Sequence, residues 1–310
     1  MSAEADGAIL VTMGEPAGIG PEVAAAAWHA LDGRVGTRPI RIVGDPALFP
    51  AIAEDAVIAT TARAARDPGR PDIANAAAVI EAIEVGVMAA LRGAGLVTAP
   101  INKAVLAQAG FPWPGHTEFL AHLTGAKRAV MMLATDVLRV VPLTIHMPLA
   151  KVPGAIRSED IVETGEIVLA ALARDFGIAK PRLAVAGLNP HAGEDGVLGG
   201  EEAAIIAPAI AALRARGHDV RGPLSADTMF HAEARTRYDA ALCLSPDPAL
   251  LTIKTLAFWE GVNVTLGLPI VRTSPDHGTA FDIAGSGKAD PRSMIAAIRM
   301  AAAMMDARER

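Results

Sequence analysis

The feature of this sequence that most constrains its fold is the alternation of short apolar runs with helical patterns. Residues 8–13, 39–43 and 95–98 have the length and apolar content of buried strands, whereas residues 72–92 and 291–308 repeat apolar side chains at helical spacing. Strands that alternate with helices are typical of an α/β protein with a largely parallel sheet. We therefore predict two α/β domains that share a mostly parallel sheet.

The same alternation continues through the middle of the chain, without a sequence repeat or a low-complexity linker. We place the first domain in residues 1–125 plus 268–310 and the second in residues 126–267. Further elements are expected as strands over 129–134, 137–145, 183–188, 240–244 and 262–266, and as helices from near residue 21 and over 161–176 and 201–216.

Composition narrows the classes of function. The 310 residues carry a net charge of −6 and no long basic run, so no nucleic-acid partner is expected, because phosphate binding needs clustered cations. A single cysteine, Cys243, excludes an internal disulfide framework. Residues 1–6 lack the apolar core of a secretory signal, and no apolar run reaches the roughly 18 residues of a membrane span. We expect a cytoplasmic protein with no membrane partner.

Two polar segments stand out in the first half of the chain. Residues 14–22 follow the first predicted strand and open a helix, so their glycines form either a tight turn or a cradle for an anion. Their spacing is not the G-x-G-x-x-G of a Rossmann site. Residues 115–118 are expected in a loop, where His116 and Thr117 are either a binding pair or solvent-facing side chains.

Two histidines in the second half follow predicted strands. His146 comes just after the strand over 137–145, and His191 comes just after the strand over 183–188. Ligands of open α/β sheets collect at the carboxyl ends of strands, and two imidazoles there can hold a divalent ion, although a zinc-type site usually takes three protein ligands. Either histidine alone favours a hydrogen-bonded structural role, whereas the pair together favours a metal site.

The remaining polar candidates lie towards the end of the chain. Lys254, Asn263 and Arg272 lie in or beside an apolar stretch, where a cation costs free energy unless an anion meets it. Together they suit a phosphate and a carboxylate, or else they form salt bridges at the protein surface. Asp227 lies in a turn over 222–228 and is either a turn-forming or a catalytic carboxylate.

A glycine-rich segment over 276–285 reads DHGTAFDIAG. It resembles the adenosine-binding loop of the decarboxylating dehydrogenases of the isocitrate and isopropylmalate type. This resemblance implies their fold, NAD or NADP as cofactor, and a hydroxy-acid substrate whose hydroxyl lies β to a carboxylate. The residues that it assigns to the cofactor are His277, Gly278, Thr279, Asp282, Gly285 and Lys288.

Six ordered segments, 14–22, 98–103, 115–120, 187–194, 222–228 and 273–290, resemble the 4-hydroxythreonine-4-phosphate dehydrogenase family of pyridoxine and pyridoxal phosphate biosynthesis. The resemblance implies a homodimer with a shared active site and a small phosphorylated amino acid, 4-phosphooxy-L-threonine, as substrate. It implies oxidation by NAD followed by loss of CO2, which yields 3-amino-2-oxopropyl phosphate. It assigns substrate binding to His116, Thr117, Lys254, Asn263 and Arg272, with His116 and Asp227 as catalytic candidates.

The metal site implied by this resemblance departs from the family pattern. His146 and His191 match two of three metal-binding histidines, but Pro246 stands where the third is expected. Neighbouring Asp247 offers an oxygen ligand instead, which would favour a harder cation such as Mg²⁺. The resemblance implies a divalent metal, which is Zn²⁺, Mg²⁺, Co²⁺ or Mn²⁺. Two alternatives therefore stay open: a related dehydrogenase of another β-hydroxy acid, such as a sugar-acid phosphate or a dihydrodiol carboxylate, and a non-catalytic paralogue.

Overall fold

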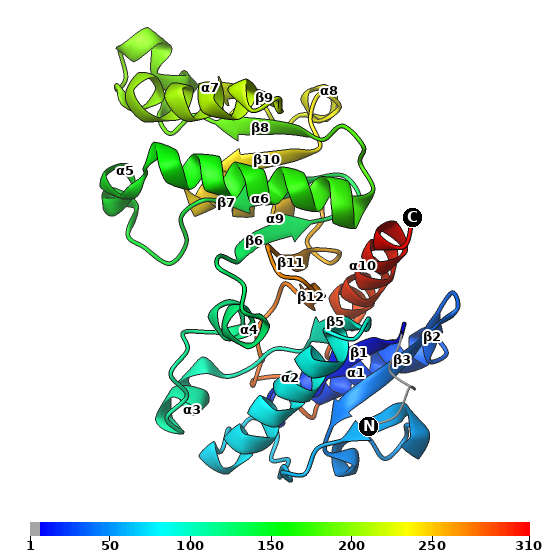
Figure 1. Cartoon of the computed structure of the whole chain (residues 1–310). Helices are drawn as coiled ribbons and strands as arrows, with labels where there is room; N and C mark the ends of the chain where they lie inside the picture. The colour runs from blue at the N-terminus through cyan, green and yellow to red at the C-terminus, as the bar shows by residue number, and fades with distance from the viewer. Residues whose placement is uncertain (1–6) are drawn as a thin grey trace. The chain divides into compact units, whose positions relative to one another are not determined.

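The computed structural model describes residues 7–310 and separates the chain into two compact units. The first unit contains the described residues up to Ala129 together with Val262–Glu309, and the second contains Val130–Gly261. Each unit is a β-sheet covered by helices, drawn mainly in blue, cyan and red for the first unit and in green and yellow for the second (Figure 1).

The sheet of the first unit is mostly parallel. Strands β3, β1, β5 and β12 run parallel to one another, whereas β11 and the short β2 are antiparallel to their neighbours, and β4 pairs in parallel with β3. The strands are, in spatial order, β2 (Arg34–Val35), β3 (Arg38–Gly44), β1 (Ile9–Thr12), β5 (Gly95–Thr98), β12 (Val271–Pro275) and β11 (Val262–Leu266), with β4 at Val57–Ala59.

Two helices, α2 (Ala76–Ala90) and α10 (Arg292–Arg308), pack on this sheet. Gly86 of α2 lies so close to Leu96 of β5 that a Cβ atom there would come within 2.7 Å of its side chain. On α10, Ala297 accepts a 2.8 Å hydrogen bond from the hydroxyl of Thr273 of β12. Three further helices complete the unit: α1 (Gly20–Ala30), α3 (Lys103–Gln108) and α4 (His116–Thr124).

The segment Ile73–Ala90 has the length and composition of a membrane-spanning helix, although no uninterrupted apolar run of that length exists in the sequence. More than half of it is buried within the protein, as expected of a core helix.

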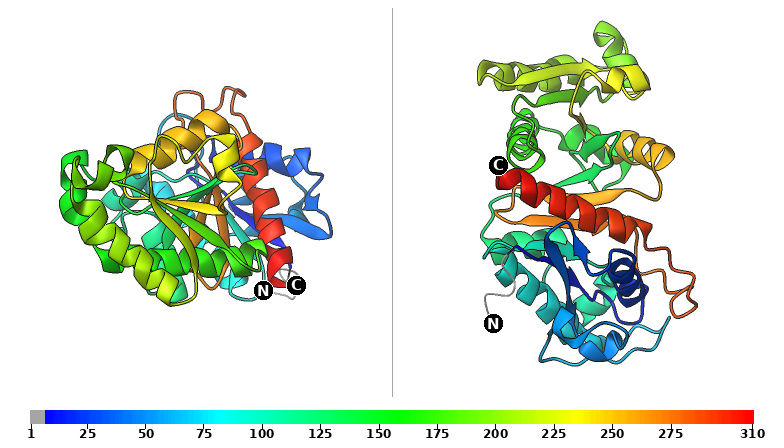
Figure 2. Two further views of the ribbon diagram at one scale, coloured as in Figure 1. Left: turned by 90° about the horizontal axis from the view of Figure 1, so that it is seen from above. Right: turned by 90° about the vertical axis from the view of Figure 1, so that its right-hand side faces the viewer.

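The second unit has a sheet in the order β6 (Val130–Ala134), β7 (Arg139–Pro142), β10 (Ala240–Cys243), β8 (Arg182–Ala186) and β9 (Asp219–Leu224). β6 and β7 form an antiparallel pair, and β7, β10, β8 and β9 are parallel. Figure 2 shows these strands and their helices from two further sides. The α-helices of this unit are α5 (Val152–Ala155), α6 (Ser158–Phe176), α7 (Ala207–Ala215), α8 (Ala232–Arg235) and α9 (Pro246–Leu256). A π-helical turn (Glu202–Ile206) leads into α7, and a 3-10 segment (Pro190–Gly196) follows β8.

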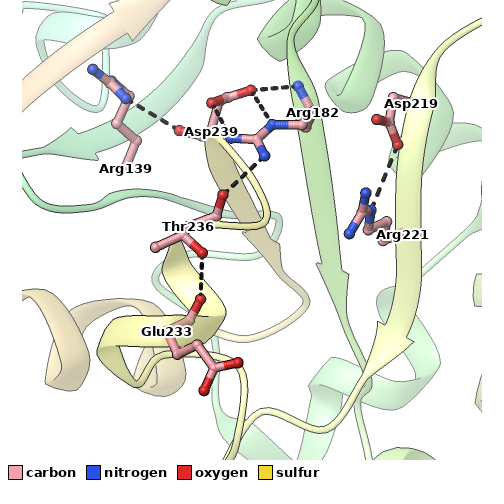
Figure 3. Close-up of polar contacts among 7 residues, drawn as sticks. All are labelled: Arg139, Arg182, Asp219, Arg221, Glu233, Thr236 and Asp239. Carbon is pink, nitrogen blue, oxygen red and sulfur yellow. Dashed lines mark hydrogen bonds and ion pairs between the residues drawn. The ribbon is translucent and has the colours of Figure 1, made fainter.

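A polar cluster fixes the amino ends of β8 and β10 (Figure 3). Arg182 donates to both carboxylate oxygens of Asp239, at 2.9 and 3.1 Å, and to the carbonyl of Thr236 at 2.9 Å. Arg139 donates to the carbonyl of Asp239 at 3.3 Å. Burial alone would raise the pKa of Asp239, but its bonds with Arg182 outweigh burial and lower it. These ionic groups join the amino ends of the strands. The loops that carry the candidate residues follow the opposite, carboxyl ends.

The fold class expected from the sequence is confirmed, and the differences lie in single elements. His116, expected in a loop, is the first residue of α4. The helix expected over 201–216 begins with the π-helical turn before α7. Strand β12 and helix α9 were not predicted, because the polar residues of β12 hide a buried strand and the prolines of α9 suggest a loop.

Candidate functional site

A row of polar side chains crosses one face of the sheet in the first unit. Arg272 on β12 donates to the hydroxyls of Thr265 on β11, at 2.7 Å, and of Thr98 on β5. Asn263 lies two residues before Thr265 on the same strand, so its side chain points to the same face. Three neighbouring strands therefore direct polar groups to one place.

Arg272 carries a positive charge that is buried without a counter-charge. Its side chain is only 3% exposed, no carboxylate within residues 7–310 pairs with it, and its Nε atom has no hydrogen-bond partner there. Burial lowers the pKa of Arg272 to about 9. A buried, uncompensated guanidinium is costly for the folded protein, so this position favours an anionic ligand.

His116 opens α4 beside this cation. Its Nε2 atom is buried and has no hydrogen-bond partner in the described chain. Burial lowers the pKa of His116 well below its usual value, and the charges of Arg272 and Lys103 lower it further. The imidazole is therefore neutral at pH 7 and can accept a proton or a hydrogen bond. Its neighbour Thr117 borders a surface hollow of about 530 Å³.

Asn263 shares one property with His116 and Arg272. Its side-chain oxygen Oδ1 is buried and has no partner in the described part of the chain. Buried polar groups are nearly always paired in native proteins, so three unpaired atoms on three residues indicate a position that a ligand completes. The last residue of the expected substrate set, Lys254, belongs to α9 of the second unit, where its ammonium lies 5.7 Å from the ring centroid of Phe258.

The loop over 276–290 lies against two other segments of the first unit. The backbone N–H of Ile19 donates to the carbonyl of Thr279 at 2.9 Å, and that of Gly285 donates to the carboxylate of Glu22 at 2.6 Å. Glu22 also accepts from Arg66 at 2.6 Å. The segment after Arg66 is tied in turn, because Gly69 donates to the carbonyl of Ala17 at 2.8 Å.

The same loop has the open backbone that a bound dinucleotide needs. A Cβ atom at Gly278 or at Gly287 would meet nothing within 4 Å, and Asp282 and Lys288 are exposed. His277 bonds the carbonyl of Gly278 through Nδ1 at 3.0 Å, whereas its buried Nε2 has no partner within residues 7–310. Both observations fit a ligand that lies along the loop.

In the second unit, His191 lies in a tightly held turn after β8. Residues 191–195 all have positive φ, and four of these five are not glycine. The turn is anchored by Glu202, which accepts 2.8 Å bonds from the backbone N–H groups of Leu188 and Asn189. His191 Nδ1 lies 3.6 Å from Asp227 Oδ2, and both side chains are exposed. A hydrogen bond from Ser225, followed by the charge of His191, lowers the pKa of Asp227.

His146 and Pro246 also follow strands of this sheet. His146 lies four residues beyond the end of β7 and has a φ of 56°. Strand β10 lies between β7 and β8, and it leads directly to Ser245 and Pro246. Pro246 is the first residue of α9, where a missing N–H costs nothing, and Asp247 is exposed in the first helical turn.

The residues do not form a complete metal site within one chain. Among residues 7–310, no three His, Cys, Asp or Glu side chains are arranged to hold an ion. His146, His191 and Asp247 all follow the carboxyl ends of neighbouring strands, but their side chains are not grouped closely enough to surround a tetrahedral or octahedral ion.

Comparison with known proteins decides the family. Residues 25–301 match the family model of the pyridoxal phosphate biosynthetic protein PdxA. The chain belongs to the PdxA family. A 4-hydroxythreonine-4-phosphate dehydrogenase of Paracoccus denitrificans (strain Pd 1222) is 55% identical over 315 aligned residues, which cover 94% of this chain and 96% of that protein.

Solved structures agree with this assignment to the PdxA family. The crystal structure of 4-hydroxythreonine-4-phosphate dehydrogenase from Klebsiella pneumoniae has a TM-score of 0.85 at 37% identity and covers 97% of this chain and 98% of its own. A β-decarboxylating dehydrogenase from Thermococcus kodakarensis, at 15% identity and a TM-score of 0.51, covers 95% of this chain and 81% of its own and shows the fold alone. The likeness to decarboxylating dehydrogenases is thus confirmed for the fold, and membership of a dehydrogenase family implies a nicotinamide cofactor.

Three residues that hold the loops of the candidate site in this PdxA-family chain were not identified from the sequence. Glu22 was included in the first glycine-rich segment without a role, and neither Arg66 nor Glu202 was considered. Each acts through contacts with residues distant in the sequence, and isolated charged residues in a helix or loop give no pattern that would single them out.

Proposed function

We propose that this protein oxidises and decarboxylates 4-phosphooxy-L-threonine with NAD in pyridoxal phosphate biosynthesis. Its relatives, which are named 4-hydroxythreonine-4-phosphate dehydrogenase, support this proposal. The observation that carries the proposal is the buried, uncompensated charge of Arg272. A phosphorylated amino acid carries the phosphate and carboxylate that such a cation accommodates, and a guanidinium binds either in a two-pronged arrangement.

The polar row around Arg272 supplies further binding groups. His116 and Asn263 each present an unpaired buried atom, a ring nitrogen and an amide oxygen respectively. We assign substrate binding to these residues together with Thr117 and Lys254. The amide oxygen can accept from a substrate ammonium or hydroxyl, and the hydroxyl of Thr117 can donate to a phosphate oxygen.

His116 is the group that we propose as acceptor of the proton from the substrate hydroxyl. Burial and two neighbouring cations keep its imidazole neutral, which is the form that a general base needs. The hydroxyl loses its proton to His116, and the carbon that carries it would give its hydride to the oxidised nicotinamide of bound NAD, which leaves a β-keto acid. The carbon–carboxylate bond then breaks with release of CO2, and its electron pair forms an enolate whose oxygen Arg272 stabilises. A proton taken up at the α-carbon completes the aminoketone phosphate. Asp227, a further catalytic candidate, lies beside His191 in the second unit.

The cofactor loop supports the choice of a dinucleotide. Bound NAD would supply the hydride acceptor, and NADP is the alternative. His277, Gly278, Thr279, Asp282, Gly285 and Lys288 would hold it, because the loop combines an open backbone with the unpaired Nε2 of His277.

A homodimer with a shared active site is part of this proposal. Large apolar side chains are exposed in the second unit, where Leu251, Phe258 and Trp259 are 67%, 61% and 47% exposed. Apolar groups of this size in one segment are typical of surfaces that another chain covers. A cytoplasmic location remains a prediction.

A second candidate function is that of a paralogue that binds the ligands without turnover. Pro246 favours it, because proline has no ligand atom at the position where a third metal-binding histidine is expected. His146 and His191, with Asp247, would then hold a divalent ion weakly or not at all.

One experiment separates the two candidates. NADH formation is followed spectroscopically with 4-phosphooxy-L-threonine and NAD, without added metal and with Mg²⁺, Mn²⁺, Co²⁺ or Zn²⁺. The first proposal expects turnover in at least one condition and its loss in Arg272→Met. The absence of NADH in every condition, together with calorimetric binding of NAD and substrate, would instead establish the paralogue.

A further inference from the structure

Three segments of the first unit meet at the side chain of Glu22. They are the first turn of α1, which carries Glu22, the segment 66–69 and the cofactor loop over 276–290. A single carboxylate oxygen, Oε1 of Glu22, accepts from Arg66 Nη2 and from the backbone N–H of Gly285, both at 2.6 Å. The side chain of Glu22 thus bonds both of the other segments.

The backbones of these segments approach too closely for side chains at the crossing points. A Cβ atom at Gly18 would come within 2.8 Å of the carbonyl oxygen of Thr279, and one at Gly285 within 2.7 Å of Pro68. Gly69 would meet the carbonyl oxygen of Phe281 at 3.2 Å. The glycines permit the contact, and the polar bonds to Glu22 fix its register.

These bonds hold some residues of the cofactor loop and leave others open. Gly285 and Thr279 are anchored to α1, whereas Gly278 and Gly287 remain open. The anchors therefore fix the loop at two points and leave the backbone at Gly278 and Gly287 free to approach a dinucleotide. Glu22 itself is directed to Arg66 and to the loop, so it acts through the loop.

We propose that Glu22 is a positioning residue that preorganises the dinucleotide-binding loop, an inference that rests on the proposed dehydrogenase function. Without Glu22 the loop pays its ordering cost when the dinucleotide binds, so affinity for NAD falls. We expect chemistry at Arg272 and His116 to be unaffected, because the bonds of Glu22 go to Arg66 and Gly285, whereas Arg272 bonds Thr265 and Thr98. The loss therefore appears in the KM for NAD and leaves kcat in place.

The test compares Glu22→Ala with Glu81→Ala in the full-length protein. Glu81 is a matched control, because its carboxylate accepts 2.7 Å bonds from the backbone N–H groups of Thr61 and Ala62 and holds the neighbouring segment without contacting the loop. We expect Glu22→Ala to raise the Kd and the KM for NAD about tenfold, since bonds to charged groups have that effect. Arg66→Ala should give a smaller rise, and Glu81→Ala none. The KM for the phosphorylated substrate should stay constant.

Hydrogen exchange gives a readout that requires no turnover. Amides over 279–285 should exchange faster in Glu22→Ala than in the wild type, and addition of NAD should restore their protection. If the wild type binds NAD and Glu22→Ala binds it equally well, the inference is wrong while the dehydrogenase proposal stands. The same holds if Glu81→Ala weakens NAD binding as much as Glu22→Ala. If the wild type binds neither NAD nor NADP, both proposals are overturned.

Discussion

Glu202 holds Asn189 at two points, accepting its backbone N–H through Oε1 at 2.8 Å and its side-chain amide through Oε2 at 2.9 Å. Glu202 is only 6% exposed. Burial alone would raise its pKa, but these bonds outweigh burial and lower it. The carboxylate is therefore the anchor of the left-handed turn that carries His191.

Replacing this anchor should loosen the turn. In Glu202→Gln one acceptor oxygen becomes an NH2 group that faces other donors, so we expect the free energy of unfolding to fall by about 2 kcal/mol in urea titrations at pH 7. A carboxyl whose pKa is lowered by folding contributes its full stability above its unfolded value of about 4.3 and loses it as the pH falls towards the folded value. The variant should therefore lose less stability than the wild type on acidification through this range. Glu201→Gln, which changes the half-buried neighbour that also bonds Asn189, should have little effect. Equal losses in the two variants would contradict this role.

Anions that bind to Arg272 should stabilise the unliganded protein. Inorganic phosphate should raise the melting temperature of the wild type, and Arg272→Met should abolish that response while raising the unliganded unfolding free energy by about 1 kcal/mol, because an uncompensated charge is removed. Arg38 is a suitable control, since it is also buried, at 7% exposed, but paired with Asp306 at 2.8 Å and Glu309 at 2.7 Å. Arg38→Met should lower stability and keep the phosphate response. A phosphate response that persists in Arg272→Met would rule out this site.

The buried imidazole of His116 makes stability depend on pH. Its pKa is lowered in the folded state, so below an unfolded value of about 6.5 the unfolded chain binds a proton that the folded chain does not. Stability should therefore fall by about 1.4 kcal/mol per pH unit between pH 6.5 and the folded pKa. Urea titrations at successive pH values should show a shallower fall in His116→Asn, whereas His29→Asn, on the exposed end of α1, should follow the wild type. Parallel curves for all three proteins would refute the burial of this ring.

A histidine in place of Pro246 should improve metal binding. Pro246→His adds an imidazole after β10, between the strands that lead to His146 and His191, so Co²⁺ should bind at least about tenfold more tightly by absorption titration. Pro248→His changes a proline in the same helical turn and should leave the affinity unchanged. Equal Co²⁺ affinity in the wild type and Pro246→His would show that this position is not next to an ion site.

The parts of the fold that sequence predicts well are those with periodic apolar residues. Strands β1 and β5 and helices α2 and α10 were expected close to their observed positions, because their burial follows from the residues within them. Helix α4 was missed because Gly115 gives it no side-chain cap and Trp113-Pro114 suggests a loop. Strand β12 was missed because its polar Arg272 is buried by neighbours from β5 and β11.

The types of residue in the candidate site could be predicted from the sequence, but their arrangement in space could not. That Arg272 lacks a counter-charge depends on where every carboxylate of the fold lies, and the role of Glu22 depends on Gly285, which is 263 positions away in the sequence. Neither fact can be inferred from the spacing of residues within a short segment of the sequence. The family resemblance identified the residues that match known motifs, and it passed over those that only hold the motifs in place.

The crossing of Gly18, Gly69 and Gly285 limits how this protein can be redesigned. A methyl group at Gly18 or Gly285 would collide with another segment, and at Gly69, as at Gly285, the backbone also has a positive φ that resists side chains. Single substitutions at these three glycines would therefore displace the loop before they altered its chemistry. Transplanting all three segments together from a relative is the route that the packing permits.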